Sequence, residues 1–368
     1  MIKLSTYLES PSQVHILSQL HTIIVDMPFC SVRAHCPHPW TSKELRAAQS
    51  NLQHQYFCLN MDGLYSDTEL SNIKSYIHTH QLFNIFNAVR LQDPGLMQWI
   101  HAHFPNITIQ LNTETGFQNS SGLAALFKAS TPPALVSLNH ELPYSVITPM
   151  ATQFKSLELF VQGPILIQYS RRQFLSDWYQ NNTDVQQSVS AQDPELPQRS
   201  FSFLNTPFGH FMFAHFHRCL ATAPDKLQKL SHLPWLVDAR GMPFEYLKTS
   251  LHLYQNLPNL TSEAITAHIT ELQELSTAPQ KPGFFLSNNT DYDWRDYTTH
   301  TQHPPIGRIV SARKGHPALL ELFTTPTSDT FICQCPDNKS ITFNQSDICV
   351  LNTDDNREDC HIPISPQK

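Results

Sequence analysis

The sequence predicts an α/β protein: a closed (β/α)8 TIM-like barrel followed by a small C-terminal antiparallel β-barrel domain. The first observation is that short apolar runs alternate with amphipathic stretches between residues 22 and 241, which is typical of a parallel sheet. The second is that eight such runs occur, the number that closes a barrel. No glycine-rich loop follows the first run, so an open doubly wound sheet is the less favoured alternative.

The predicted strands are short and rich in β-branched and other apolar residues. In chain order they are TIIVDM (22–27), YFCLN (56–60), NAVRLQD (87–93), ITIQLN (107–112), ALVSLN (134–139), LELFVQG (157–163), GHFMFAH (209–215) and WLVDARG (235–241). Between them, segments such as SKELRAAQSNLQ (42–53) and PGLMQWIHAHF (94–104) carry apolar residues at three- and four-residue spacing. These segments predict amphipathic helices.

Polar groups at the ends of the apolar runs predict the working face, because the loops after barrel strands form the site in such barrels. The residues in question are Asp26, Asn60, Asp93, Asn112, Asn139, Gln162 and Asp238. Asn and Asp are also good helix N-caps and loop starters, so each has a purely structural interpretation as well. Together they predict a polar ring around one mouth of the barrel.

The composition changes after the last predicted barrel strand. A helical stretch, TSEAITAHITELQELS (261–276), precedes a region rich in Pro, Asn, Thr and aromatic residues, and a period-two pattern with turn signals follows. We therefore expect four parts. They are a barrel at 1–258, a helical and irregular connection at 259–303, a β-domain at 304–352 and an acidic mobile tail at 353–368.

Composition and charge limit the classes of function. The chain has 368 residues, 40% of them hydrophobic, and no apolar run approaches the 18 residues of a membrane span. The N-terminus lacks the pattern of a signal peptide, so a cytoplasmic protein without a membrane partner is expected. The net charge of −7 gives no general attraction to nucleic acid, so an RNA partner would need a local basic patch.

The histidines and cysteines predict no metal site. The 20 His show no pair at metal-ligand spacing beside a carboxylate, and the eight Cys are scattered, as in a protein with reduced thiols. Cys333 and Cys335, with Cys349 and Cys360, leave a zinc site open as an alternative, although their C-x-C spacing is not the usual knuckle. Reduced thiols are the simpler interpretation.

Seven fragments in order resemble one family. They are LNMDG, QDPGL, IQLNTETGFQN, SLNHEL, FVQGPILIQYSRRQFLSDWY, LVDARG and GFFLSNNTDYDWRDY. With IGRIVSARKG, they make the chain similar, over about residues 9–350, to the collagenase-like peptidase family (peptidase class U, family thirty-two). The resemblance is greatest to the bacterial branch implicated in hydroxylating the wobble uridine of transfer RNA, and it implies a barrel and a C-terminal β-domain.

The sequence departs from this family where the family binds an iron–sulfur cluster. Relatives carry His-Gly at the end of the sixth predicted strand and two cysteines around the next turn, but here Gln162, Leu166 and Gln173 stand in these positions. No cysteine occurs at 177–200, and only Cys219 lies near a family ligand position. One thiol cannot hold a four-iron cluster, so we expect the cluster to be absent.

The resemblance also supplies candidate ligand-binding residues. They are Arg33, Asn60, Asp93, Asn119, Glu141, Tyr169, Ser170, Arg172, Asp238 and Arg240, with His140 where relatives carry Arg. A ring of Arg33, Arg172 and Arg240 is expected to hold a dicarboxylate or a phosphate by bidentate bonds. Alternatively, these arginines pair with Asp93, Glu141 and Asp238 and simply close the mouth. No catalytic residue is predicted.

Three functions follow from the resemblance and the departures from it. The first is a protein related to RNA modification, of the tRNA hydroxylation type, that binds a small organic acid, RNA or both at the barrel mouth. The second is a peptidase, but a hydrolase needs a nucleophile with a base or an open metal site, and Ser170 has no evident base in the sequence. The third is a non-catalytic subunit that works with a cluster-bearing homologue.

Overall fold

We describe a computed structural model of the chain, which forms two compact units, Met1–Asn288 and Asn289–Lys368. The structure describes residues 2–28, 30–31, 38–52, 56–113, 116–175, 187–192, 199–206, 208–276, 278–286, 307–311, 317–323, 330–334, 340–344, 349–352 and 359–363. No helix in these ranges has both the length and the apolar character needed to cross a membrane.

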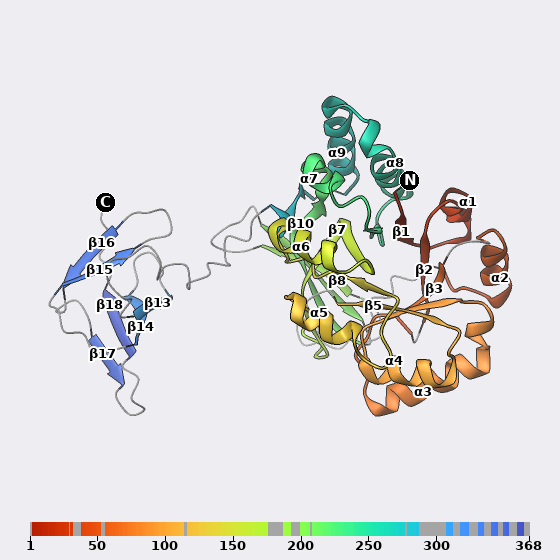
Figure 1. Ribbon diagram of the computed structural model, residues 1–368, viewed down its shortest axis with the longest axis horizontal. Helices are drawn as coiled ribbons and strands as arrows, with labels where there is room; N and C mark the ends of the chain where they lie inside the picture. Colours follow the sequence, from red (N-terminus) through yellow and green to blue (C-terminus); the bar gives the residue numbers. More distant parts are fainter. Residues whose placement is uncertain are drawn as a thin grey trace. The chain divides into compact units, whose positions relative to one another are not determined.

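The first unit is built on a closed barrel of eight parallel strands (Figure 1). The strands are β1 (Leu4–Tyr7), β2 (Thr22–Asp26), β3 (Tyr56–Met61), β4 (Ala88–Leu91), β5 (Thr108–Asn112), β6 (Leu135–Ser137), β7 (Leu157–Ser170) and β11 (Trp235–Val237). They pair in this order, and β11 closes the circle because it pairs in parallel with both β7 and β1. The predicted TIM-like barrel is therefore confirmed.

One predicted barrel strand is wrong. The run 209–215 belongs to β10 (Gly209–Cys219), which pairs antiparallel with β7 outside the barrel, and β1 takes the remaining place in the barrel. The reason lies in the burial pattern, since every residue of β1 is buried whereas the middle of β10 is only half-buried. A strand buried on both faces suits a barrel wall, and a half-exposed strand suits an antiparallel sheet.

Helices cover the outside of the barrel (Figure 1). They are α1 (Val14–Leu17), α2 (Ser42–Ser50), α3 (Asp67–His80), α4 (Pro94–His103), α5 (Ser120–Phe127), α6 (Tyr144–Gln153), α7 (Pro224–Gln228), α8 (Phe244–Asn256) and α9 (Ser262–Ser276). Capping boxes start two of them, Thr41 with Glu44 at α2 and Ser66 with Glu69 at α3. Their apolar faces pack against the outer face of the strands in one continuous core.

The barrel interior is filled by a separate set of side chains. Tyr7, Ile24, Cys58, Ala88 and Leu236 form a small apolar cluster that is distinct from the core beneath the helices. Such filling is expected for an eight-strand barrel, whose interior is a packed core and not a pore.

Beyond the barrel, β7 continues into a second layer of strands. Its outer half pairs with β10, which pairs in turn with β9 (Ser200–Thr206) and then β8 (Gln187–Gln192), while β12 (Gln280–Lys281) lies on the inner half of β10. Gly163, with φ of 131°, marks the point where β7 leaves the barrel. A Cβ there would lie 2.2 Å from the carbonyl oxygen of Asp238, so only glycine permits this close approach.

The second unit is antiparallel, as predicted. In its described residues β13 (Gly307–Ser311), β14 (Pro317–Leu322), β18 (Asp359–Pro363) and β17 (Cys349–Asn352) form one sheet in this spatial order, and β15 (Thr330–Gln334) pairs with β16 (Ser340–Asn344). β18 falls within residues 353–368, the segment that the sequence analysis expects to be an acidic mobile tail. Its pairing with both β14 and β17 satisfies its backbone groups. Cys335 lies outside the described residues.

Candidate ligand-binding site at the barrel mouth

The carboxyl ends of the barrel strands bring several polar side chains to one face. Asp26 ends β2, Asp62 follows β3, Asn112 ends β5 and Asp238 follows β11. All four are buried, with exposed fractions of 5 to 7%. Because parallel barrel strands all end at the same face, these groups form a polar layer across the mouth.

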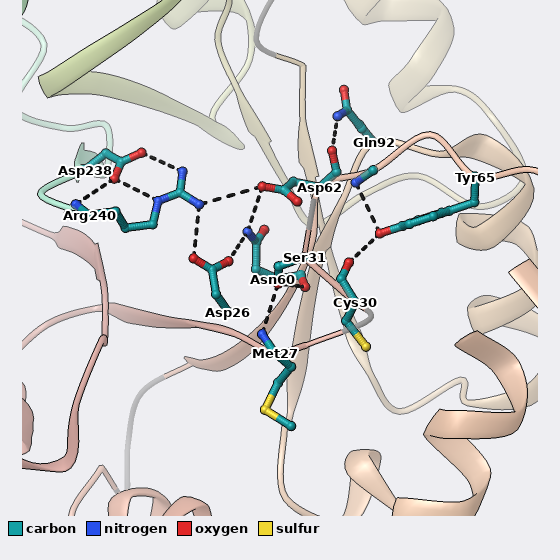
Figure 2. A network of polar contacts seen from close by, with 11 residues as sticks. Asp26, Met27, Cys30, Ser31, Asn60, Asp62, Tyr65, Gln92, Asp238 and Arg240 are labelled. Atoms are coloured by element: carbon teal, nitrogen blue, oxygen red, sulfur yellow. Dashed lines mark hydrogen bonds and ion pairs between the residues drawn. The ribbon is translucent and has the colours of Figure 1, made fainter. Parts of the chain in front are cut away.

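Arg240 is the centre of this layer (Figure 2). Its Nη2 and Nε donate to the two carboxylate oxygens of Asp238 at 2.6 and 2.9 Å, and its Nη1 lies 3.2 Å from Asp26 and 3.7 Å from Asp62. The guanidinium carbon also lies 3.7 Å from the centre of the Tyr7 ring, a cation–π contact. One guanidinium therefore neutralises part of the charge of three carboxylates.

Burial and the neighbouring charges shift the pKa values of Asp26 and Arg240. Burial raises the pKa of Asp26, although the neighbouring Arg240 opposes the shift. Burial alone would lower the pKa of Arg240, but Asp238 and Asp26 outweigh it, and the net shift is upward. Arg240 therefore remains charged and committed to its carboxylates.

Asn60 fixes the relative position of two of the carboxylates. Its amide nitrogen donates to Asp26 at 2.6 Å and to Asp62 at 3.0 Å. The backbone carbonyl oxygen of Asn60 accepts a bond from the Ser31 hydroxyl at 2.8 Å, and the Gln92 side chain donates to the backbone carbonyl oxygen of Asp62 (Figure 2). These supporting bonds pre-organise the layer.

A small cavity of about 30 Å³ adjoins this polar layer. Its walls include Tyr7, Asn112, Ser137, His140, Phe160 and Asp238, which come from β1, β5, β6, β7, β11 and the loops after them. A volume of this size holds one or two water molecules or a small polar group. The cavity walls combine aromatic and polar side chains.

The outer half of β7 forms a roof over the mouth, which we define as residues 163–172. Pro164 and Leu166 of the roof line the cavity. At its far end Arg171 donates to the carbonyl oxygen of Leu64 and to both carboxylate oxygens of Glu69, each at 2.8 Å. Glu69 lies in the first turn of α3, the helix after β3, and β3 lies four strands from β7 in either direction around the barrel. The roof thus spans the mouth and is tied to the opposite wall.

An apolar cluster stiffens the roof. Leu166 packs with Leu204 and Phe211 of the neighbouring strands. The Tyr169 ring stacks on Phe211 with 4.8 Å between ring centres, and its hydroxyl donates to the carbonyl oxygen of Phe208 at 3.0 Å. The run that follows Gly163 in the sequence is therefore a braced cover, and its aromatic residue is part of the bracing.

Three of the predicted site residues, Asn60, Asp238 and Arg240, meet in the network of Figure 2. Arg240 forms with Asp238 the ion pair that the alternative interpretation expected. Two other predicted residues lie where helices begin: Asp93 caps α4 through Leu96 N at 2.8 Å, and Asn119 caps α5 through Gly122 N at 2.8 Å. The N-cap interpretation that the sequence offered for strand-end residues therefore describes the contact of Asp93, and Asn119 makes the same kind of contact.

The remaining predicted residues are spread over the roof and the loops. Tyr169 and Ser170 are on the roof, where the Ser170 hydroxyl accepts a bond from the backbone nitrogen of Arg172, whose side chain is exposed. Glu141 is half-buried after β6 and accepts a long bond of 3.5 Å from Gln118. Arg33 lies outside the described residues. Within the described part of the chain, Arg172 and Arg240 do not share one anion-binding pocket.

The positions that differ from cluster-bearing relatives have other roles in this chain. Gln162 donates to Tyr246 at 2.5 Å and to Gln280 at 2.8 Å, beneath the helices. Leu166 packs into the roof, and Gln173 donates to the carbonyl oxygen of Thr206 at 2.5 Å. Each replacement is thus used in packing or hydrogen bonding.

The thiols of Cys30, Cys58 and Cys219 are poor ligands and nucleophiles. Burial raises the pKa of Cys30 and of Cys58 to about 12 and that of Cys219 to about 11. All three are buried and free of disulfides. Over the described ranges, no group of three or more His, Cys, Asp or Glu side chains could hold a metal ion.

Sequence reasoning missed two buried arginines. Arg90 forms an ion pair of 2.5 Å with Glu158 inside the barrel, and Arg218 of β10 donates to the carbonyl oxygen of His140 at 2.6 Å. Arg90 stands in a run otherwise made of Ala, Val and Leu, and this isolated charge was the available signal for a buried ion pair. Arg218 offered no comparable signal, because it directly follows another polar residue, His217.

Comparison with known proteins identifies the family. Among solved structures, a class V chitinase from Nicotiana tobaccum is 9% identical over 64% of this chain and 93% of its own, with a TM-score of 0.35. Phosphoribosyl anthranilate isomerase from Thermotoga maritima is 11% identical over 75% and 100%, with a TM-score of 0.34. These likenesses are too weak to carry an argument, and no curated protein matches the chain. The model of peptidase family U32 matches residues 17–295, more than half of the chain, and the chain therefore belongs to peptidase family U32.

Proposed function

We propose that this member of peptidase family U32 binds a small organic acid at the barrel mouth, holds no iron–sulfur cluster and acts in RNA modification of the tRNA hydroxylation type. The observation that carries the proposal is the cavity at the carboxyl ends of the strands, walled by Asn112, Ser137 and His140 and covered by the roof. Polar groups that converge under a braced cover suit a small polar ligand. The role in RNA modification rests on the resemblance to that branch of the family.

Hydrolysis of peptides is the less favoured function. Ser170 lies on the roof with its hydroxyl bonded to a backbone nitrogen, and in the described residues no base contacts it. The thiols of Cys30, Cys58 and Cys219 are protonated at neutral pH because burial raises their pKa. A peptidase needs an activated nucleophile or a metal-bound water, and the described part of the mouth provides neither.

The partners that fit this proposal are an RNA substrate and a cluster-bearing homologue. Relatives use thiolates for the cluster, and Gln162, Leu166 and Gln173 of this chain cannot supply them. A subunit without a cluster would depend on a homologue for redox chemistry. A cytoplasmic location is part of the proposal.

The test is a native mass spectrum of the protein purified without oxygen, read together with its iron and sulfide content. We expect a bound organic acid and no stoichiometric iron or sulfide. A brown protein with near-stoichiometric iron and sulfide would contradict the loss of the cluster. A protein that carries no ligand and shows no thermal stabilisation by any organic acid would contradict the binding function.

A further inference from the structure

Arg218 is a buried guanidinium with one edge left without partners. Its side chain is 1% exposed, and its Nη1 donates to the carbonyl oxygen of His140 at 2.6 Å. Its Nε and Nη2 are buried, and neither has a hydrogen-bond partner among the described residues. No ion pair of Arg218 occurs in that part of the chain either. A buried charged donor without an acceptor is strongly unfavourable, so this edge needs a partner that binds there.

The two unpartnered atoms have the geometry of a carboxylate receptor. Nε and Nη2 form one edge of the planar guanidinium, and their two N–H bonds point in parallel. This edge matches the two oxygens of a carboxylate in a bidentate contact. The third nitrogen is anchored by His140, so the orientation of the fork is fixed before a ligand arrives.

Arg218 is connected to the cavity at the mouth through residues that line it. It contacts two residues of the cavity wall, His140 through its hydrogen bond and Phe160 at 5.9 Å from the ring centre. In the sheet it lies opposite Gly163, next to Pro164 of the same wall. A second ring, that of Phe285, also lies 5.9 Å from the guanidinium. Although burial lowers the pKa of Arg218 to about 9, the group remains charged at neutral pH.

We infer that Arg218 receives the carboxylate of the small organic acid, through bidentate hydrogen bonds from Nε and Nη2. This inference rests on the proposed function and changes its assignment of residues, because Arg240 is already bound by carboxylates and Arg172 is exposed. Asp238 lines the cavity whose wall Arg218 contacts, and it disfavours a second negative charge on the ligand. The ligand class is therefore a monocarboxylate end group and not a phosphate.

The test is a titration of the full chain with sodium acetate, followed by thermal unfolding at constant ionic strength with chloride as the balancing anion. Acetate is expected to stabilise the wild type, and its neutral isostere acetamide is not. Arg218→Gln is expected to weaken the apparent acetate affinity about 10- to 100-fold. Arg46→Gln makes the same change on the exposed face of α2 and is expected to leave the affinity unchanged.

The outcomes separate the inference from the proposed function. Equal acetate responses of the wild type and Arg218→Gln would overturn the inference and leave the binding function standing. If Arg172→Gln lost the stabilisation by acetate and Arg218→Gln kept it, the acetate would bind at Arg172, as the sequence predicts, and the inference would be overturned. Stronger stabilisation by inorganic phosphate than by acetate would overturn the carboxylate class. A wild type that responds to no organic acid would overturn both the inference and the proposed function.

A second measurement covers the case in which Arg218→Gln does not fold. The ¹⁵N–¹H signal of the Arg218 Nε is assigned by its loss in Arg218→Lys, which keeps the charge but not the fork. In the wild type this signal is expected to shift on addition of acetate and to stay in place on addition of acetamide. A signal that does not respond to acetate would overturn the inference without any need of a folded Gln variant.

Discussion

At the scale of single residues, this chain places charge inside the barrel at two levels. In the middle of the barrel Arg90 and Glu158 form an ion pair with exposed fractions of 1 and 0%. At the mouth Arg240 is bound by Asp238 and its neighbours. Buried pairs are weak evidence for stability as such, but each partner depends strongly on the other.

The first prediction concerns the pair in the middle of the barrel. Arg90→Met is expected to lower the free energy of unfolding by about 3 to 5 kcal/mol, because it leaves the Glu158 carboxylate buried without its cation. The double variant Arg90→Met with Glu158→Met removes both charges and is expected to recover most of this loss. Urea unfolding measures both variants. If the double variant were as unstable as the single one, lost packing and not the unpaired charge would be the cause.

The second prediction concerns Glu9, whose carboxylate accepts the backbone nitrogen of Gly241 at 2.9 Å beside the mouth. Burial raises the pKa of Glu9 from 4.5 to about 7, against the opposing bond from Gly241. Between these two values the folded state holds a proton that the unfolded state has lost. The free energy of unfolding therefore falls as the pH rises through this window.

Glu9→Gln mimics the protonated form, so it isolates this effect. We expect the variant to match the wild type at about pH 4, below this window, and to be the more stable of the two at about pH 8, as measured by urea unfolding at both pH values. Glu274→Gln removes a carboxylate from an exposed position and serves as the control. A stability difference between wild type and Glu9→Gln that does not change with pH would show that Glu9 does not titrate in this range.

Some residues at the barrel mouth could be predicted from the sequence, and others could not. Asn60 and Asp238 were predictable at the barrel mouth, because polar groups directly after apolar runs take defined positions at the end of a barrel strand, whereas Arg240 was expected there only from the resemblance to the family. Arg218 was not predictable, since it follows another polar residue in the run HFHRC and its burial depends on partners remote in sequence, among them Phe285. The pairing of β10 with β7 and β12 accompanies the burial of both His217 and Arg218, and the local pattern does not reveal this long-range pairing.

At the scale of elements, the roof is the feature that distinguishes this mouth from an open barrel. Its position depends on the bend at Gly163, on the cluster around Leu166 and Phe211 and on the contact of Arg171 with Glu69. The sequence showed an apolar run that breaks at a glycine and starts again, but not that the second half pairs with β10. That pairing is a long-range contact, and the local pattern allowed β10 to be read as a barrel strand.

The third prediction concerns the tie between the roof and the opposite wall. Arg171→Ala is expected to change the free energy of unfolding by about 1 kcal/mol or less, because the ion pair with Glu69 is largely exposed. The backbone amides of residues 165–170 are nevertheless expected to exchange with deuterium about tenfold faster, because the far end of the roof loses its anchor. Arg172→Ala removes the neighbouring arginine and is the matched control for this exchange measurement.

Two results would contradict this role of Arg171. Unchanged exchange in Arg171→Ala would show that the apolar cluster alone holds the roof. Equally faster amide exchange in Arg171→Ala and Arg172→Ala would show that the effect comes from changing residues 171–172 as such and not from the contact with Glu69. Either result would remove the tie to the opposite wall as a feature of the site.

At the scale of the whole molecule, the chain divides into Met1–Asn288 and Asn289–Lys368. The barrel and the antiparallel character of the second unit were predictable, because both depend on local periodicity. The sequence placed the end of the barrel at 258, whereas the first unit continues through α9 and β12 to Asn288. Two features tie this last stretch to the barrel unit: Phe285 is fully buried in its core, and Gly283 packs beside Ile165.

The last prediction tests this division. A chain that ends at residue 288 is expected to unfold cooperatively with a thermal midpoint close to that of the barrel in the full chain, because it keeps the whole of the first unit. A chain that ends at residue 276 is the matched control. It lacks β12, which pairs with β10, and the fully buried Phe285, whose loss alone is expected to cost about 3 to 5 kcal/mol. Circular dichroism melting measures both, and we expect a clear loss of stability only in the shorter chain. If the chain ending at 288 failed to fold, the barrel would require the C-terminal β-domain, and the two units would form one cooperative structure.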